Sequence, residues 1–186
     1  QKWGMRLSKL SGEIGVLDKD PSKINVALVK AKFNYDVTEE METLAIKRLK
    51  ELGVKLKLIT DGDVSGALMV TDDKYNVDIF LGIGGGPEGV LAAAALDAYD
   101  CSFQGRFLFD TDEDKTRAKK MGIKDLSKKY EINEIVTGDS IFCATGITSG
   151  DLVSGIKIEN DVYVSETFVT HKSTGLKETI KLKQNI

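Results

Sequence analysis

The chain has 186 residues, of which 41% are hydrophobic and 30% charged, a composition typical of one globular domain rather than of a disordered protein. Its formal net charge of −3 offers no basic excess to neutralise a phosphate backbone, which argues against a nucleic-acid surface. No apolar run reaches the length of a membrane helix, and the two cysteines, Cys101 and Cys143, lie at no metal-site spacing. We therefore expect a reduced, cytoplasmic protein.

Strands and helices alternate along the first two thirds of the chain, which favours an α/β fold. Apolar and β-branched runs predict strands over residues 24–29, 54–59, 77–81 and 106–109. Helices are predicted from about residue 36 to Gly53, and over residues 64–70, 87–99 and 111–121. Further strands are predicted over residues 141–144, 152–158 and 162–169. We expect residues 1–186 to form a single α/β domain, a layered sheet packed by helices with a strand-rich C-terminal section.

The glycine-rich segment over residues 82–89 reads Gly-Ile-Gly-Gly-Gly-Pro-Glu-Gly and joins a predicted strand to a predicted helix. We interpret it as a turn at a helix N-terminus, where free N–H groups and the helix dipole favour anions. Glu88 lies in the first helical turn, where an outer carboxylate oxygen can still hold a divalent cation. Phosphate and a hard metal in one loop indicate phosphatase chemistry.

Two further loops follow predicted strands and join this segment at one edge of the sheet. Lys30 and Lys32 follow the first strand, and Asp61, Gly62 and Asp63 follow the second. In open α/β sheets, ligands bind at the carboxyl ends of the strands. Lysines supply point charges for phosphate, and the aspartates accept hydrogen bonds from sugar hydroxyls.

Each of these features also has a purely structural interpretation. The aspartates can simply flank a turn in which Gly62 takes a positive φ, and the lysines can simply be solvated. Glu88 can merely counter the helix dipole. His171, without a nearby histidine or cysteine, is expected to be a surface residue. No nucleophile motif is present, so the sequence assigns no catalytic residue.

A dinucleotide-binding domain is an alternative. Gly84, Gly86 and Gly89 satisfy the G-x-G-x-x-G spacing between a strand and a helix, and Asp110 follows where a ribose-binding acid is expected. Against this, Glu88 would place a negative charge beside the pyrophosphate, and the motif lies on the third strand.

Three stretches, in the same order, resemble the class II fructose-1,6-bisphosphatases across about residues 24–170. Residues 60–64, Thr-Asp-Gly-Asp-Val, are similar to that family's Asp-Gly-Asp-Val segment. Residues 82–90 resemble its Gly-Ile-Gly-Gly-Ala-Pro-Glu-Gly-Val segment. Residues 144–152, Ala-Thr-Gly-Ile-Thr-Ser-Gly-Asp-Leu, resemble its Ala-Thr-Gly-Ile-Thr-x-Gly-Asp-Leu segment.

The resemblance implies the metal-dependent, lithium-sensitive sugar-phosphatase fold. It implies hydrolysis of the 1-phosphate of fructose 1,6-bisphosphate, and in some members of sedoheptulose 1,7-bisphosphate, with Mg²⁺ or Mn²⁺. By position it implies Glu88 as a metal ligand and Gly85 as a backbone contact to the substrate. Sugar binding is implied for Asp61, Gly62 and Asp63, and binding of the remote 6-phosphate for Lys30 and Lys32.

Two departures from the family pattern bear on function. Lys30-Ala31-Lys32 stands where the family often has Lys-Pro-Arg, so a lysine point charge replaces an arginine side chain that could bind phosphate through two hydrogen bonds. The family's N-terminal Asp-Pro-x-Glu/Asp-Gly-Thr signature, which supplies further metal-binding carboxylates, has no counterpart here, and the chain opens with Gln1.

We therefore expect the C-terminal half of a phosphatase, with little activity alone. Its expected partners are a sugar bisphosphate, the N-terminal half of the same enzyme and further copies in a homo-oligomer, with no nucleic acid and no membrane. A phosphosugar-binding module without catalysis, or half of a split enzyme, remains an alternative.

Overall fold

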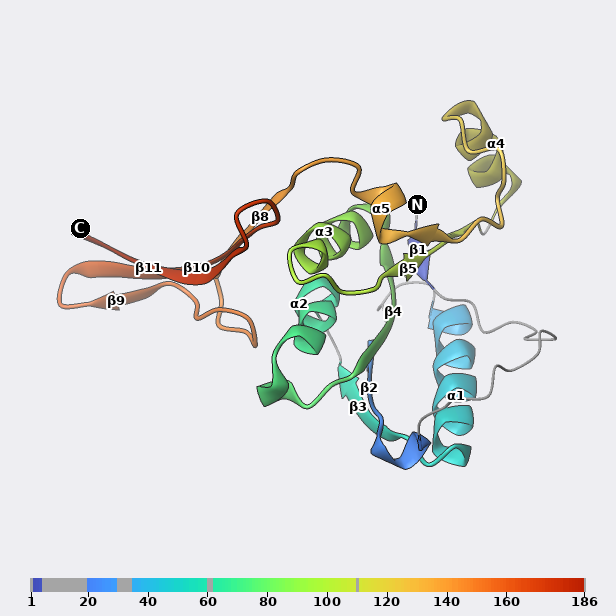
Figure 1. Ribbon diagram of the computed structural model, residues 1–186, viewed down its shortest axis with the longest axis horizontal. Coiled ribbons are helices and arrows are strands. Elements are labelled where there is room, and N and C mark those ends of the chain that lie inside the picture. The colour runs from blue at the N-terminus through green and yellow to red at the C-terminus, as the bar shows by residue number, and fades with distance from the viewer. Residues whose placement is uncertain (1, 5–19, 30–34, 60–61, 110, 186) are drawn as a thin grey trace. The chain divides into compact units, whose positions relative to one another are not determined.

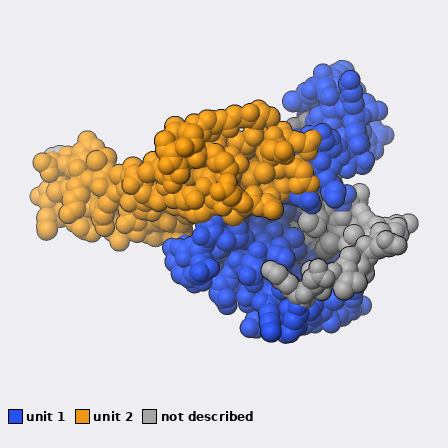
Figure 2. Space-filling model, in the orientation of Figure 1, with its two compact units in different colours: residues 1–89, 104–130 blue, residues 90–103, 131–186 orange. Residues whose placement is uncertain are grey.

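The computed structural model describes residues 2–4, 20–29, 35–59, 62–109 and 111–185. It divides into two compact units (Figure 2). Unit 1 comprises residues 1–89 and 104–130, and unit 2 comprises residues 90–103 and 131–186. Helices and strands are mixed throughout (Figure 1), so the predicted α/β class is confirmed. That residues 1–186 act as a single domain stays a prediction.

Unit 1 is built on a five-stranded sheet with the order β3-β2-β4-β1-β6. These strands are β1 (Lys2–Gly4), β2 (Asn25–Val29), β3 (Lys55–Ile59), β4 (Ile79–Gly85) and β6 (Phe107–Leu108). The central strands β2, β3 and β4 run parallel, as the alternation of strands and helices predicts, and β1 pairs antiparallel with β4 and β6. Two short strands, β5 (Gln104–Gly105) and β7 (Tyr130–Glu131), form a separate pair.

The predicted helices are all present, with ends close to those expected. They are α1 (Tyr35–Glu51), α2 (Asp63–Leu68), α3 (Gly86–Asp97) and α4 (Asp112–Lys120), joined by the unpredicted short α5 (Ile132–Ile135). Short 3₁₀ turns are η1 (Pro21–Lys23), η2 (Met69–Thr71) and η3 (Asp73–Tyr75). Glycines end α1 and α4 as predicted, since Gly53 has φ 75° and Gly122 has φ 92°. Thr111 caps α4, its hydroxyl accepting a 3.1 Å bond from the Asp114 N–H.

The core of unit 1 lies between α2 and the parallel strands. Ala27, Met69 and Val77 are buried together, with Phe80 packed against them. A Cβ atom on Gly66 would lie 2.8 Å from the Phe80 ring, so α2 approaches β4 closely enough that only hydrogen fits at that position. The phenyl ring therefore sets the distance between this helix and the sheet, next to the loop that precedes α2.

Unit 2 carries an antiparallel sheet in which β10 is central. Its strands are β8 (Ile141–Thr145), β9 (Lys157–Glu159), β10 (Val162–His171) and β11 (Leu176–Asn185). All ten residues of β10 pair with β11, while β8 and β9 pair with different halves of its other edge. Phe142, Val164, Phe168 and Thr170 are buried on one face of this sheet. The rings of Phe142 and Phe168 meet edge to face, with centroids 6.3 Å apart.

Lys172 ties the end of this sheet to the end of α3. Its Nζ donates to the Asp97 carbonyl oxygen at 2.7 Å and to Asp100 Oδ1 at 2.7 Å. A cation at a helix C-terminus is favoured by the dipole, so the contact fixes α3 against the β10–β11 turn. The contact also lowers the pKa of Asp100, chiefly through the hydrogen bond from Lys172.

The predicted strand over residues 152–158 is wrong, because only Lys157–Glu159 is extended and paired. The preceding residues close a loop instead. The Gly155 N–H donates to Ser149 Oγ at 3.0 Å, the Ile156 N–H donates to the Ile147 carbonyl at 3.2 Å, and the Ser154 N–H donates to Glu166 Oε2 at 2.9 Å. These bonds satisfy backbone groups that a strand would have used in a ladder.

None of the helices in the described part of the chain is long and apolar enough to span a bilayer.

Candidate functional site

The carboxyl ends of β2, β3 and β4 lie side by side, which is the edge where ligands were expected. The register places Val29 beside Ile59 on one side and beside Gly82 on the other, so β4 continues three residues beyond this level to Gly85. β2 and β3 therefore end beside the last residues of β4. Of the predicted site residues, Lys30, Lys32 and Asp61 fall outside the described part of the chain.

Gly62 and Asp63 form the start of α2 at this edge. Gly62 adopts the left-handed conformation, with φ 91° and ψ 64°, as its place in a turn predicted. Its carbonyl oxygen accepts bonds from the Gly66 N–H at 2.7 Å and from Ser65 Oγ at 3.0 Å. Asp63 is the first residue of the helix and is partly buried. The turn thus fixes the point from which the Asp63 side chain leaves the backbone.

The glycine-rich segment is not a turn, which corrects the expectation drawn from its sequence. Residues 82–85 are the last four residues of β4, and Gly86 begins α3 directly. No residue of the segment has a positive φ. At Gly82, Gly84 and Gly85, other side chains occupy the space that a Cβ atom would fill.

Two carboxylates occupy that space at neighbouring positions. A Cβ atom on Gly84 would overlap the Asp63 carboxylate, whose Cγ would be 3.1 Å away. A Cβ atom on Gly85 would overlap the Glu88 carboxylate, whose Cδ would be 3.0 Å away. Asp63 and Glu88 therefore both lie at the end of β4, within unit 1, but against successive strand residues, Gly84 and Gly85, which face opposite sides of the sheet.

Glu88 is exposed in the first turn of α3, and no described residue forms a hydrogen bond or ion pair with it. A carboxylate in that position has oxygens available for a hard cation. Among the described residues, however, no three His, Cys, Asp or Glu side chains come together so as to hold a metal ion. Glu88 could therefore supply one ligand of a metal ion, and the other ligands would have to come from outside the described residues.

His171 is partly exposed, and it has hydrogen-bond partners that its isolation in the sequence did not indicate. Its Nε2 lies 2.7 Å from Asp139 Oδ2 and 3.0 Å from Ser173 Oγ, and its Nδ1 lies 3.0 Å from Thr174 Oγ1. Hydrogen bonds from Ser173, and then the bond to His171, lower the pKa of Asp139 to about 2. Since Ser173 and Thr174 belong to the β10–β11 turn, these bonds hold the turn against Asp139, and we assign the cluster a structural role.

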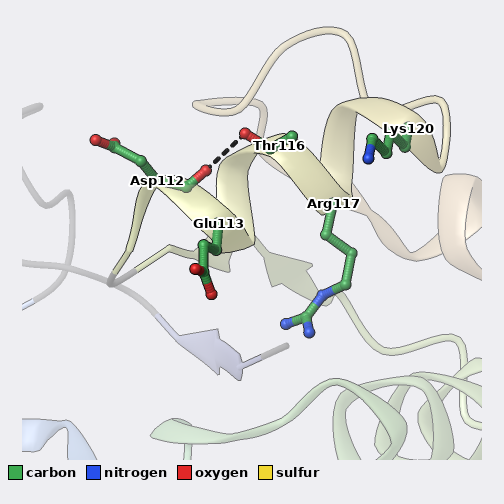
Figure 3. Close-up of a pocket in the computed structure, with 5 residues that line it drawn as sticks. All are labelled: Asp112, Glu113, Thr116, Arg117 and Lys120. Atoms are coloured by element: carbon green, nitrogen blue, oxygen red, sulfur yellow. Dashed lines mark hydrogen bonds between the residues drawn. The ribbon is translucent and has the colours of Figure 1, made fainter.

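A cavity of about 510 Å³ lies along α4, away from the predicted site residues. It is lined by Asp112, Glu113, Thr116, Arg117 and Lys120 (Figure 3). All of these residues belong to one helix, and the Thr116 hydroxyl is occupied by a 2.8 Å bond to the Asp112 carbonyl oxygen. The cavity borders the charged face of α4, and none of its described lining residues comes from a second helix or strand. We therefore assign it no ligand.

Comparison with known proteins identifies the family. Residues 38–184 match the family described as "Bacterial fructose-1,6-bisphosphatase, glpX-encoded". A relative from Synechococcus sp. (strain JA-3-3Ab) is 34% identical over 166 residues, which cover 82% of this chain and 46% of the relative. It is named D-fructose 1,6-bisphosphatase class 2/sedoheptulose 1,7-bisphosphatase.

Other relatives carry the same name. One from Acaryochloris marina (strain MBIC 11017), whose name ends in the number 2, is 36% identical, and the match covers 76% of this chain and 42% of the relative. One from Prochlorococcus marinus (strain MIT 9515) is 38% identical and covers 62% of this chain and 39% of the relative. The chain spans about half the length of the curated relatives that it matches. By the family match across most of its length, the chain belongs to the bacterial, glpX-encoded fructose-1,6-bisphosphatase family.

Proposed function

We propose that this chain is the C-terminal half of an enzyme that hydrolyses the 1-phosphate of fructose 1,6-bisphosphate, and also accepts sedoheptulose 1,7-bisphosphate. The observation that carries the proposal is that the Asp63 carboxylate lies against Gly84 and the Glu88 carboxylate against Gly85, so that both reach the carboxyl edge of the sheet at the end of β4. Family membership favours this interpretation of the glycine segment over the dinucleotide-binding alternative.

In this proposal the edge holds the part of the substrate that does not react. Asp61 and Asp63 accept hydrogen bonds from sugar hydroxyls, with Gly62 allowing the turn between them. Lys30 and Lys32 neutralise the remote 6-phosphate as point charges. The Gly85 backbone contacts the sugar where the absence of a side chain permits close approach. Together these groups orient the substrate so that its 1-phosphate faces the Glu88 carboxylate.

Glu88 is proposed as one ligand of Mg²⁺ or Mn²⁺, with the other ligands provided by the N-terminal half. When bound, such ions supply an activated water and neutralise the charge that develops on the phosphoryl group. Glu88 lies at the N-terminus of α3, where the helix dipole favours an anionic side chain. Since one carboxylate cannot hold a metal cluster, the chain alone should show little turnover.

The remaining features of the proposal concern the setting of the enzyme. We place it in the cytoplasm, as a homo-oligomer in which residues 1–186 act as one α/β domain. The lack of a three-ligand cluster among the described residues favours one second candidate, a phosphosugar-binding module without catalysis.

Binding of fructose 6-phosphate to the chain alone tests the proposal, because this ligand keeps the sugar and the remote phosphate and needs no metal. Asp63→Ala should weaken binding by about 10- to 100-fold, as expected for losing a hydrogen bond to a charged group. Asp112→Ala is the matched control, because Asp112 is also the first residue of its helix. Equal affinity for wild type and Asp63→Ala would contradict the assignment. NAD binding that ignores Mg²⁺ would revive the dinucleotide alternative.

A further inference from the structure

Helix α2 begins without the usual cap. Its N-cap residue, Gly62, has no side chain that could accept a bond from the first N–H groups of the helix. Instead, a side chain from within the helix bonds back to the turn. The Ser65 hydroxyl donates a 3.0 Å hydrogen bond to the Gly62 carbonyl oxygen, which also accepts the 2.7 Å bond from the Gly66 N–H. One carbonyl oxygen of the turn is therefore held by two donors of the helix.

The Ser65 side chain fills the space beside Gly62. A Cβ atom on Gly62 would overlap the Ser65 hydroxyl and would lie 3.8 Å from Ser65 Cβ. Gly62 has φ 91°, which residues with a Cβ atom rarely adopt, but a glycine can also adopt many other conformations. Glycine therefore permits this turn and does not by itself fix it. The Ser65 hydroxyl adds a bond that forms in one orientation of the peptide group between Gly62 and Asp63.

The backbone that carries Ser65 is itself fixed by the core of unit 1. Gly66, the next residue, lies so close to the sheet that its Cβ atom would be 3.5 Å from Ile59 Cδ1, in addition to its contact with the Phe80 ring. Gly66, Ala67 and Leu68 are buried. A helix of six residues is too short to be stable alone, so this packing holds α2 in place. The Ser65 hydroxyl therefore reaches the turn from a fixed position.

The peptide group that Ser65 fixes leads directly to a predicted site residue. Rotation of this group would move the Asp63 backbone, from which the carboxylate extends to its place against Gly84. The core thus holds α2, the Ser65 hydroxyl holds the turn, and the turn directs the Asp63 side chain toward β4. Without the hydroxyl, the turn could adopt other orientations. The fraction of molecules with Asp63 against Gly84 would then fall, and the apparent affinity for any ligand of that carboxylate would fall with it.

We propose that Ser65 is a positioning residue for the sugar, acting through the Gly62 turn on the Asp63 carboxylate without touching the substrate. This inference rests on the proposed function, which assigns the binding of sugar hydroxyls to Asp63. Because Ser65 orders the turn before the substrate arrives, binding does not have to supply that ordering, and the affinity for the sugar is higher. A purely structural hydroxyl would stabilise α2 and leave the affinity for a sugar phosphate unchanged.

Calorimetric titration of the full chain with fructose 6-phosphate tests this with three variants. Ser65→Ala should raise the dissociation constant about 3- to 10-fold, as expected for losing one hydrogen bond that holds a binding group in place. Ser65→Thr keeps a hydroxyl and should bind within about 2-fold of the wild type. Thr71→Val is the matched control, because Thr71 Oγ1 donates a 2.8 Å bond to the Leu68 carbonyl oxygen, also three residues back, in the turn that follows α2. Its affinity should stay within about 2-fold of the wild type.

Thermal unfolding of the same variants separates positioning from stability. Ser65→Ala and Thr71→Val should lower the melting temperature by similar amounts, because each loses one partly buried bond from a hydroxyl to a carbonyl oxygen. Only Ser65→Ala should also lose affinity. Wild-type affinity in Ser65→Ala, a loss that Ser65→Thr does not restore, or an equal loss in Thr71→Val would overturn the role of Ser65 while leaving the proposed function intact. A wild-type chain that does not bind fructose 6-phosphate would contradict the proposed function itself, and this role with it.

Discussion

Gly82→Ala should destabilise unit 1, although alanine is normally the better residue in regular structure. Gly82 has no positive φ, so alanine meets no backbone strain and should gain roughly 0.5–1 kcal/mol from the restricted unfolded chain. Its Cβ atom, however, would lie 2.6 Å from Val29 Cγ1 and 2.9 Å from the Phe80 ring. Val29 is buried, and the Phe80 ring is already held against Gly66, so neither can move freely.

Overpacking of this kind costs about 1–3 kcal/mol, which leaves a net loss of roughly 0–2.5 kcal/mol, centred slightly above 1 kcal/mol, after the gain from alanine. Gly84→Ala is the matched control two residues along the same strand. There the atoms nearest to the new Cβ atom belong to Asp63, whose side chain can turn at a cost of about 0.5–1.5 kcal/mol, which the gain from alanine offsets, so stability should be nearly unchanged.

Urea unfolding followed by circular dichroism would measure both variants. We expect a lower midpoint for Gly82→Ala, with a melting temperature reduced by roughly 2–8 °C, and wild-type values within error for Gly84→Ala. Gly84→Ala should nonetheless weaken fructose 6-phosphate binding, because Asp63 is displaced. A Gly82→Ala protein as stable as the wild type would refute the close packing of Val29, Phe80 and Gly82.

Three further predictions follow from contacts outside the proposed site. NMR titration should give the Asp139 carboxyl a midpoint near pH 2, below the ordinary pKa of 3.8. The contribution of Asp139 to the stability of the fold should therefore be complete above about pH 4 and should be lost as the pH falls towards 2. A midpoint near the ordinary value would contradict the Ser173 and His171 bonds. Lys172→Met should raise the pKa of Asp100 towards its ordinary value in the same titration, and an unchanged pKa would count against the contact. Gly146→Ala should lower the free energy of unfolding by about 2 kcal/mol, seen as a lower urea midpoint, because its Cβ atom would lie 2.9 Å from the Ser154 carbonyl carbon. Gly150→Ala in the same loop meets nothing within 4 Å and should be neutral.

The arrangement of the parallel strands could be predicted from the sequence because local signals agreed with the fold. Residues 24–29 and 54–59 are continuous apolar or alternating runs, and Gly53 and Gly122 mark helix ends by a conformation that glycine adopts readily. The loops that follow parallel strands must meet at one edge, so Asp63, Gly85 and Glu88 could be placed at that edge without coordinates.

The glycine segment shows where that reasoning fails. A run of glycines reads as a turn when only local conformation is considered, but the structure extends β4 to Gly85. The space beside Gly82 and Gly84 is taken by Val29 and Asp63, which are distant in sequence, and beside Gly82 also by Phe80 of the same strand. The useful signal was the spacing of two residues between Gly82 and Gly84, because residues two apart in a strand face the same side of the sheet and can contact the same neighbouring layer.

The C-terminal strands were only partly predictable. β11 was missed because all its described side chains are exposed. Its sequence therefore lacks the regular apolar pattern that a buried strand face would require. Its alternation of Leu176, Ile180 and Leu182 with lysines was the available signal. The strand predicted over residues 152–158 failed because Gly155 packs against the backbone of residues 147–149, a contact that periodicity does not reveal. His171 was likewise assigned to the surface because Asp139, its partner, is 32 residues away.

The most direct test of the proposed function is phosphate release from fructose 1,6-bisphosphate with Mn²⁺, using this chain combined with the unmatched half of the Synechococcus relative. We predict release only from the combination, its loss in Glu88→Ala, and its retention in Glu113→Ala, a matched exposed glutamate in the first turn of α4. If Glu88 only counters the helix dipole, the two variants will behave alike. Release that survives in Glu88→Ala would contradict the assignment of this edge of the sheet as a metal-dependent phosphatase site.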